Sequence, residues 1–137
     1  MTAVAGVLDL ASGDLAFSVA GHEPPVLVPA EGVPELVTVE GGRVLGLIEA
    51  SEFPVNRLRL GRGDAVVLYT DGVSEAQDAA GRFFGLERLV AATASLRHEA
   101  APALTDGVLK AVRAFAGGAP QSDDITILTL RHLGPRG

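Results

Sequence analysis

The acidic residues best suited to chemistry fall in two short clusters that are well separated in the sequence. Asp71 lies just after the apolar segment 65–69, separated from it by Thr70, and Asp123-Asp124 directly precedes the strand-like segment 125–130. If these segments pair as antiparallel neighbours, the end of one lies beside the start of the other. That pairing would bring Asp71 and Asp123 together and let their side chains project into a common cleft.

Two interpretations of these acidic residues remain open at this level. Facing carboxylates repel each other unless a proton or a cation lies between them, and oxygen ligands without His or Cys favour Mg²⁺ or Mn²⁺. Asp-Gly is, however, also a common turn dipeptide, and an Asp-Asp pair before a strand is usually solvated. Glu75 has the same two interpretations: an acid close to Asp71, or an exposed residue early in a helix.

The three histidines favour structural roles. His22 lies between a glycine and a Pro-Pro pair, where we expect it to fix a loop by hydrogen bonding; a position near a functional site is the alternative. His22, His98 and His132 show no spacing typical of metal ligands, and His98 and His132 are predicted to be solvent-exposed.

The tripeptide Arg62-Gly63-Asp64 matches an integrin-binding sequence, but it lies where a hairpin turn is needed. The turn is the favoured interpretation, and adhesion has little support beyond the three residues.

Length and composition exclude several classes of function. A chain of 137 residues fits one domain, and 47% hydrophobic with 20% charged residues predicts a folded one. The net charge of −6 argues against nucleic acid as a partner, because binding to phosphate backbones needs a basic surface. The absence of cysteine excludes disulfides and thiolate chemistry. No secretion signal or membrane-spanning stretch is evident, so we expect a cytoplasmic protein that does not associate with membranes.

The elements that must position the acidic residues follow an α+β order. The strand-like segments are residues 3–10, 14–20, 26–28, 36–39, 55–60, 65–69 and 125–130. The first two are predicted to form an antiparallel hairpin, and the continuous apolar run 65–69 is predicted to be a central, buried strand. Gly41-Gly42 is expected to interrupt the chain.

Two amphipathic helices are predicted before the last strand, over residues 86–96 and 103–115. The second has a clear apolar stripe formed by Leu104, Val108, Val112 and Phe115, and the pair Gly117-Gly118 is expected to end it.

Taken in order, several segments resemble the PPM family of metal-dependent protein phosphatases, and within it the bacterial SpoIIE/RsbU-like branch. The segments are residues 4–28, 41–49, 60–85 and 121–131, which cover nearly the whole chain. The combination of Tyr-Thr-Asp-Gly-Val with Asp-Asp-Ile-Thr is highly specific for that branch.

The resemblance implies an antiparallel β-sandwich with flanking helices, the α-β-β-α fold, which holds two Mn²⁺ or Mg²⁺ ions between its sheets. In such enzymes a metal-activated water attacks the phosphorus of phosphoserine or phosphothreonine. Motif matching assigns Asp71 and Asp123 as metal ligands, with Asp124 as an adjacent ligand or a supporting residue. It also places the backbone of Gly72 next to the metal, Glu75 near an additional weaker metal site, and His22 on a loop near the site.

The chain departs from the family pattern in one respect. The family's Gly-Asp-x-x-Asp motif, which supplies an aspartate that bridges both metals, and the Gly-His-Gly motif after it do not occur, since Gly13-Asp14 is followed by Leu-Ala-Phe. We therefore expect residues 1–137 to be a single phosphatase domain that is incomplete at its N-terminus. Such a domain would bind metal weakly and would expose apolar sheet surface and unpaired strand edges.

Two functions follow from the resemblance. The first is dephosphorylation of a regulatory protein, typically an anti-sigma-factor antagonist in this branch, under the control of upstream sensor or regulatory domains. The alternative is a non-catalytic pseudophosphatase fragment that binds a partner or forms a homo-oligomer through its exposed sheet.

Overall fold

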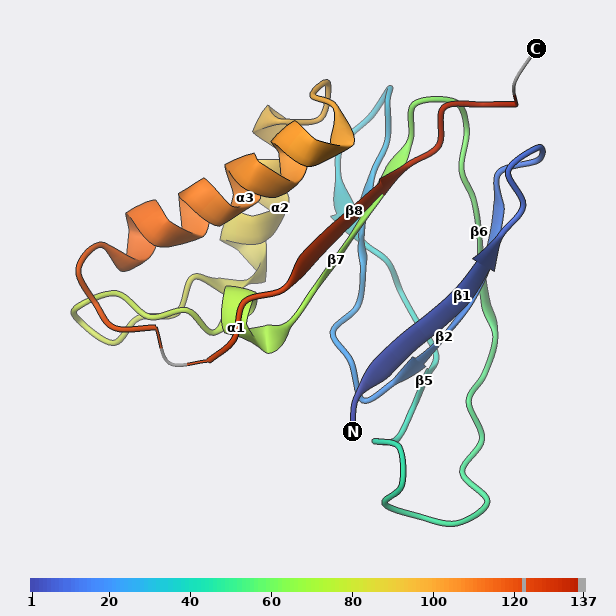
Figure 1. Cartoon of the computed structure of the whole chain (residues 1–137), viewed down its shortest axis with the longest axis horizontal. Coiled ribbons are helices and arrows are strands. Elements are labelled where there is room, and N and C mark those ends of the chain that lie inside the picture. The colour runs from blue at the N-terminus through green and yellow to red at the C-terminus, as the bar shows by residue number, and fades with distance from the viewer. Residues whose placement is uncertain (122, 136–137) are drawn as a thin grey trace.

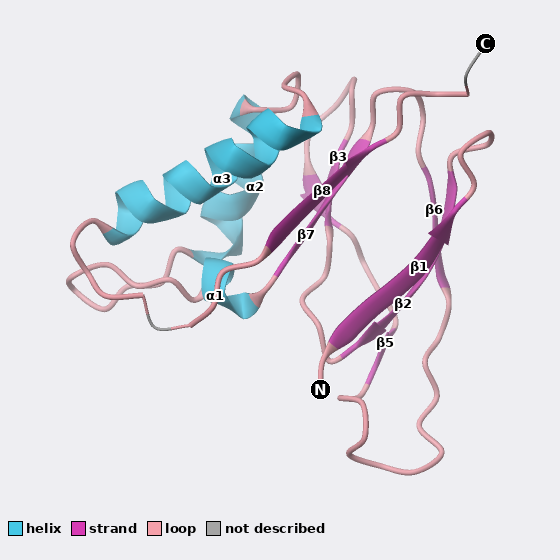
Figure 2. Cartoon of the chain, in the orientation of Figure 1, coloured by secondary structure: helices cyan, strands magenta, loops and turns pink. Residues whose placement is uncertain are grey.

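The computed structural model describes residues 1–121 and 123–135. Two four-stranded sheets face each other, and three helices cover the outer face of one of them (Figures 1 and 2). The first sheet contains β1 (Ala3–Leu8), β2 (Asp14–Ala20), β5 (Gly41–Gly42) and β6 (Asn56–Arg59). The second contains, in order, β4 (Glu35–Leu36), β3 (Val26–Val28), β7 (Ala65–Tyr69) and β8 (Ile127–Arg131). The helices are α1 (Asp71–Ser74), α2 (Gly85–Ser95) and α3 (Ala101–Ala116).

The predicted α+β sandwich and its first hairpin are confirmed. β1 and β2 pair as antiparallel strands from Ala3 opposite Ala20 to Leu8 opposite Leu15. The turn between them is held by the Asp9 carboxylate, which accepts the backbone N–H groups of Ala11 and Ser12 at 2.9 and 3.0 Å. These hydrogen bonds, with that of Ser12 the stronger, lower the pKa of Asp9.

β7 is the central strand of the second sheet, as its continuous apolar sequence predicted. It pairs on one side with β3 and on the other with β8, in both cases antiparallel. The ladder with β8 runs from Ala65 opposite Arg131 to Tyr69 opposite Ile127. The C-terminal end of β7 therefore lies beside the N-terminal end of β8.

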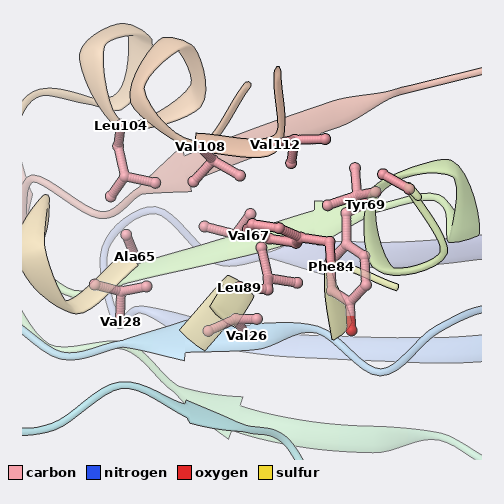
Figure 3. Close-up of a cluster of buried hydrophobic side chains, with 12 residues drawn as sticks. Val26, Val28, Ala65, Val67, Tyr69, Phe84, Leu89, Leu104, Val108 and Val112 are labelled. Atoms are coloured by element: carbon pink, nitrogen blue, oxygen red, sulfur yellow. The ribbon is translucent and has the colours of Figure 1, made fainter. Parts of the chain in front are cut away.

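The hydrophobic core lies between this sheet and the helices. The stripe predicted on α3 faces inward, and Figure 3 shows Leu104, Val108 and Val112 pointing toward Val67 of β7. The buried members are Val26, Val28, Ala65, Val67, Tyr69, Val73, Ala76, Phe84, Leu89, Leu104, Val108 and Val112. Full burial of one such Val or Leu side chain contributes about 1.5–3 kcal/mol, so this layer fixes the sheet that carries Asp71. Within the described residues, no helix has the length and apolar character that crossing a membrane requires.

The two sheets are open along one side of the sandwich. β1 and β8 are the edge strands there, and both lie toward the viewer in Figure 1. Between the sheets is an apolar cavity of about 250 Å³, lined by Val4 and Leu8 from β1 and by Leu128 and Leu130 from β8 among others. Leu128 is 57% exposed. This face therefore combines unpaired backbone groups with apolar side chains, a combination that favours association.

Two sequence-based expectations are corrected by the structure. Gly41-Gly42 does not simply interrupt the chain: it forms β5, which pairs parallel with Val19 and Ala20 of β2. The absence of a side chain is needed at Gly42, because a Cβ atom there would overlap the ring of Phe53.

His132 was expected to be solvent-exposed, but it is only 6% exposed. Its ring nitrogens lie 3.0 Å from the carbonyl oxygen of Leu10 and 3.4 Å from that of Gly61. Because these carbonyls belong to turns that adjoin strands of both sheets, the ring is enclosed where the sheets meet. No local sequence pattern indicates that contact.

Tyr69 supplies a test of the core. Its ring is buried, and its hydroxyl has no hydrogen-bond partner among the residues that the structure describes. Burial, with a smaller contribution from the charge of Glu23, raises the pKa of Tyr69 well above its ordinary value of 10.0. The folded state therefore holds this proton more tightly than the unfolded state does. The contribution of this raised pKa to the free energy of unfolding is fully present below pH 10 and is lost as the pH rises above 10.

We predict that Tyr69→Phe raises the free energy of unfolding by about 1 kcal/mol at pH 7, because it removes a buried hydroxyl without a partner. Above pH 10 the free energy of unfolding should also fall less in the variant than in the parent protein, because the variant has no Tyr69 hydroxyl to ionise. Urea denaturation of both proteins at pH 7 and pH 10.5 measures these differences. A substitution that destabilises the protein at pH 7 would show instead that the hydroxyl makes a stabilising hydrogen bond.

Candidate functional site

The ends of β7 and β8 bring the two acidic segments together. The antiparallel ladder continues one pair beyond the strands, because the backbone N–H of Thr70 donates to the carbonyl oxygen of Thr126 at 3.1 Å. Asp71 follows the first of these residues, and Asp124 lies two residues before the second. The convergence of the two acidic segments at one end of the sheet, predicted from antiparallel pairing, is therefore present.

The Thr70 hydroxyl ties the segments together a second time. It donates to the carbonyl oxygen of Asp124 at 3.1 Å and accepts the backbone N–H of Thr126 at 3.1 Å. Thr70 occupies the N-cap position of α1, where a threonine hydroxyl often accepts an N–H group of the helix, yet here it makes no such capping bond. The side chain instead links the loop before β8 to the end of β7.

Gly72 permits the close approach of the two segments. It is buried, and a Cβ atom at this position would overlap the carbonyl oxygen of Asp124. Any side chain would therefore push the Asp124 segment away from the start of α1. The structure explains the glycine of the Asp-Gly pair by this contact rather than by a positive φ angle, which Gly72 does not have.

No residue range was predicted for the helix α1, although one interpretation of Glu75 placed that residue early in a helix. It spans only Asp71–Ser74, which is too short to show an amphipathic period. Its hydrogen bonds hold the backbone of Asp71, whose carbonyl oxygen accepts the N–H of Glu75 at 2.8 Å and the hydroxyl of Ser74 at 3.4 Å. The Asp71 side chain stays exposed while its carbonyl oxygen is held within α1.

The other predicted acidic residues are also exposed. Glu75 ends α1, and Asp123 and Asp124 lie in the loop before β8. The Asp123 carboxylate accepts the backbone N–H of Asp124 at 2.7 Å, and its carbonyl oxygen accepts the side-chain amide of Gln121 at 2.8 Å. The carboxylate of Asp123 is therefore oriented locally, toward its own loop.

His22 lies on the loop between β2 and β3 and is partly buried. The hydrogen bond that the structure gives its ring joins Nδ1 to the carbonyl oxygen of Glu23 at 3.1 Å, which agrees with the expected loop-fixing role. The antiparallel register of β3 with β7, in which Val26 lies opposite Val67, places the end of this loop beside the end of β7.

The acidic residues have the oxygen ligands that a hard cation prefers, but too few of them lie close together to form a complete metal site. Carboxylate oxygens are the ligands that Mg²⁺ and Mn²⁺ prefer. Among residues 1–121 and 123–135, however, no three His, Cys, Asp or Glu side chains are grouped closely enough to hold a metal ion. The structure thus supplies two adjacent acidic segments and not a full set of ligands.

The acidic residues of this site are evident from the sequence, whereas the role of Thr70 is not. A threonine before Asp-Gly at a helix start suggests an ordinary N-cap, and nothing local links it to Thr126, 56 residues later. The available signal was positional: the ladder between the two strands places these threonines opposite each other.

Comparisons with known proteins agree with this architecture. The family model described as stage II sporulation protein E (SpoIIE) matches residues 1–133. Protein IcfG of Synechocystis sp. is 31% identical over 125 residues, which are 91% of this chain and 19% of IcfG.

Solved structures show the same fold. The RsbU and RsbW domains of Rv1364c from Mycobacterium tuberculosis superpose with a TM-score of 0.79 at 28% identity, over 99% of this chain and 37% of that one. The phosphatase domain of SpoIIE from Bacillus subtilis superposes with a TM-score of 0.74 at 17% identity, over 99% of this chain and 59% of that one. The chain therefore spans about a fifth of IcfG and less than two thirds of each of these structures.

The link made by Thr70 can be tested by a matched pair of substitutions. We predict that Thr70→Val lowers the free energy of unfolding by about 0.5–1.5 kcal/mol, because it removes the hydrogen bonds of the hydroxyl with Asp124 and Thr126, whereas Thr70→Ser keeps the hydroxyl and most of the stability. Amide hydrogen exchange at Thr126 should accelerate in the valine variant alone. Equal exchange rates in the two variants would show that the hydroxyl does not hold the loop.

Proposed function

Because the chain belongs to the SpoIIE family, we propose that it forms part of a Mn²⁺- or Mg²⁺-dependent phosphatase acting on phosphoserine or phosphothreonine of a regulatory protein. The fold is that of PP2C-type phosphatase domains. The observation that supports the proposal most directly is the meeting of the Asp71 and Asp124 segments at the end of the β7–β8 ladder, fastened by Thr70.

In this proposal Asp71, Asp123 and Asp124 offer carboxylate oxygens to the metal. Bound Mn²⁺ or Mg²⁺ would supply a water of lowered pKa and neutralise the charge of the phosphoryl group. The protein's contribution is to hold the ligands in place. The carbonyl oxygen of Asp71 is held within α1, and the residue before it, Thr70, is joined to the Asp124 segment.

Three further residues have supporting roles in the proposal. Gly72 keeps the two acidic segments in contact, and Glu75 adds an exposed carboxylate at the end of α1 that could serve an additional, weaker metal site. His22 fixes the β2–β3 loop near the end of β7.

We also propose that residues 1–137 are an incomplete phosphatase domain. The described residues group fewer than three possible ligands, whereas a two-metal centre needs more. The remaining carboxylates would come from a segment outside these residues, consistent with the 59% of the SpoIIE phosphatase domain that the chain covers.

The proposed partners are a phosphorylated regulatory protein of the anti-sigma-factor antagonist type and upstream sensor or regulatory domains. The support is indirect: in Rv1364c, an RsbU domain and an RsbW domain belong to the same protein.

The acidic site predicts the outcome of a charge-removing substitution. Asp71→Asn and Asp123→Asn should each lower Mn²⁺-dependent hydrolysis of p-nitrophenyl phosphate and of a phosphoserine peptide by about 100-fold or more, since each removes a proposed ligand. The natural-length protein is the sample, and release of p-nitrophenol or phosphate is the readout. Asp106→Asn is the matched control, because Asp106 is exposed on α3 and its ion pair among the described residues is with Lys110, at 3.1 Å. Full activity of the Asp71 variant would contradict the proposal.

The open side of the sandwich favours a second candidate function, a non-catalytic module that binds a partner or forms a homo-oligomer. Its support is the pair of edge strands β1 and β8 with the apolar cavity between them.

If this alternative holds, the 137-residue chain should associate as its concentration rises, and Leu128→Lys should weaken that association because it places a charge on the open face. Val33→Lys is the control, since Val33 is 77% exposed and lies outside the cavity. Sedimentation velocity at a series of concentrations gives the result. A chain that stays monomeric throughout, or that responds equally to both substitutions, would count against this function.

A further inference from the structure

A groove runs away from the acidic site along the helical side of the molecule. Two cavities form it, an inner one of about 230 Å³ and an outer one of about 490 Å³. They share Gln77 on one wall and Ala119, Pro120 and Gln121 on the other, so they adjoin each other. We call this feature the α1–α3 groove, because its walls are the loop that follows α1 and the loop that follows α3.

The inner end of the α1–α3 groove lies at the acidic site. Gly72 lines it, and Gly72 both follows Asp71 and contacts the carbonyl oxygen of Asp124. Its apolar lining includes Ala76, Val112 and Ile125. At about 230 Å³, the inner cavity is smaller than the ~300–1,000 Å³ that is typical of small-molecule sites. It suits one apolar side chain better than a whole small ligand.

Arg113 places a cationic side chain without an ion-pair partner among the described residues on the wall of the groove. It lines the inner cavity from the last turn of α3, where a cation also interacts favourably with the helix dipole. Among the described residues it makes no ion pair and no side-chain hydrogen bond. Neighbouring cations differ: Lys110 pairs with Asp106 at 3.1 Å, and the guanidinium of Arg88 lies 4.6 Å from the ring centroid of Phe115.

The acidic residue on the outer wall does not balance this charge. Asp78 pairs with the guanidinium of Arg82 at 2.7 Å and also accepts the backbone N–H groups of Ala80 and Arg82 at 2.9 Å. The carboxylate of Asp78 is thus already satisfied on its own loop, and Arg113 remains available to an outside anion.

We infer that the α1–α3 groove docks the polypeptide of the phosphoprotein substrate beside its phosphorylated residue, with an apolar side chain in the inner cavity and a carboxylate against Arg113. The inference rests on the proposed phosphatase function and adds a substrate preference to it. When the phosphorylated residue of the substrate lies against Asp71 and Asp124, the substrate residues on either side of it lie at the inner end of the groove. One uncompensated arginine fits one carboxylate, whereas a nucleic acid or an anionic membrane needs a broad basic surface.

Two substitutions remove the proposed contacts in different ways. Arg113→Glu reverses the charge, and Arg57→Glu is its matched control, because Arg57 is exposed on β6 in the other sheet. Gly118→Trp fills the outer cavity, which Gly118 lines. A Cβ atom at Gly118 meets nothing within 4 Å, and its φ angle is not positive, so the fold should accept the larger residue.

The test measures binding of fluorescent phosphoserine peptides to the natural-length protein with Mn²⁺ by anisotropy. In the first set of peptides, Leu and Glu are placed at successive positions on either side of the phosphoserine. In the second set, Gly replaces Leu and Lys replaces Glu at the same positions. We expect some Leu/Glu peptides to bind about tenfold more tightly than the Gly/Lys set, and Arg113→Glu and Gly118→Trp to abolish this preference while Arg57→Glu preserves it.

The outcomes separate the docking inference from the phosphatase proposal. Equal affinity for both peptide sets, or an equal loss in the Arg57 variant, overturns docking in the groove. If Arg113→Glu and Gly118→Trp both leave the rate of phosphate release unchanged, docking in the groove is overturned, but the phosphatase proposal stands. Peptide binding that follows the groove substitutions without any phosphate release supports docking and contradicts the phosphatase proposal.

Discussion

The antiparallel ladder between β7 and β8 is the contact on which both the core and the acidic site depend. One side of β7 faces α3 and completes the helical core, while the pairing with β8 places the segments of Asp71 and Asp124 at one end. Ladder hydrogen bonds alone set an approximate separation. The Thr70 hydroxyl and the missing side chain of Gly72 then fix it, because one joins the segments and the other lets them touch.

Sequence patterns predicted the parts of this fold that depend on local hydrophobicity. The unbroken apolar run of β7 indicated a central strand, and the stripe of Leu104, Val108 and Val112 indicated the buried face of α3. The elements that were missed depend on distant partners. β5 exists because Gly41-Gly42 pairs with β2, and His132 is buried because turns from both sheets surround it. Neither contact leaves a periodic trace in the sequence.

The candidate site likewise has features that the sequence predicts and features that depend on distant contacts. Residue type and strand order were enough to place Asp71 near Asp123 and Asp124, and the family resemblance supplied their proposed role. The contribution of Thr70 could not be predicted, since its partners lie 54 and 56 residues away in the sequence. The extent of the ligand set also could not be predicted from spacing, because it depends on which carboxylates the folded chain groups together.

Both ends of β8 are fixed by contacts that lie beyond the strand itself. Near the acidic residues the strand is fastened through Thr70, and at its far end the N–H of His132 donates to the carbonyl oxygen of Asp64 at 2.9 Å while its ring contacts the β1–β2 turn. A strand clamped at both ends cannot slide along its neighbour without breaking both clamps. The two ends of β8 are therefore coupled: a displacement of the acidic segment along β7 would also disturb the buried ring of His132 and its contact with the β1–β2 turn.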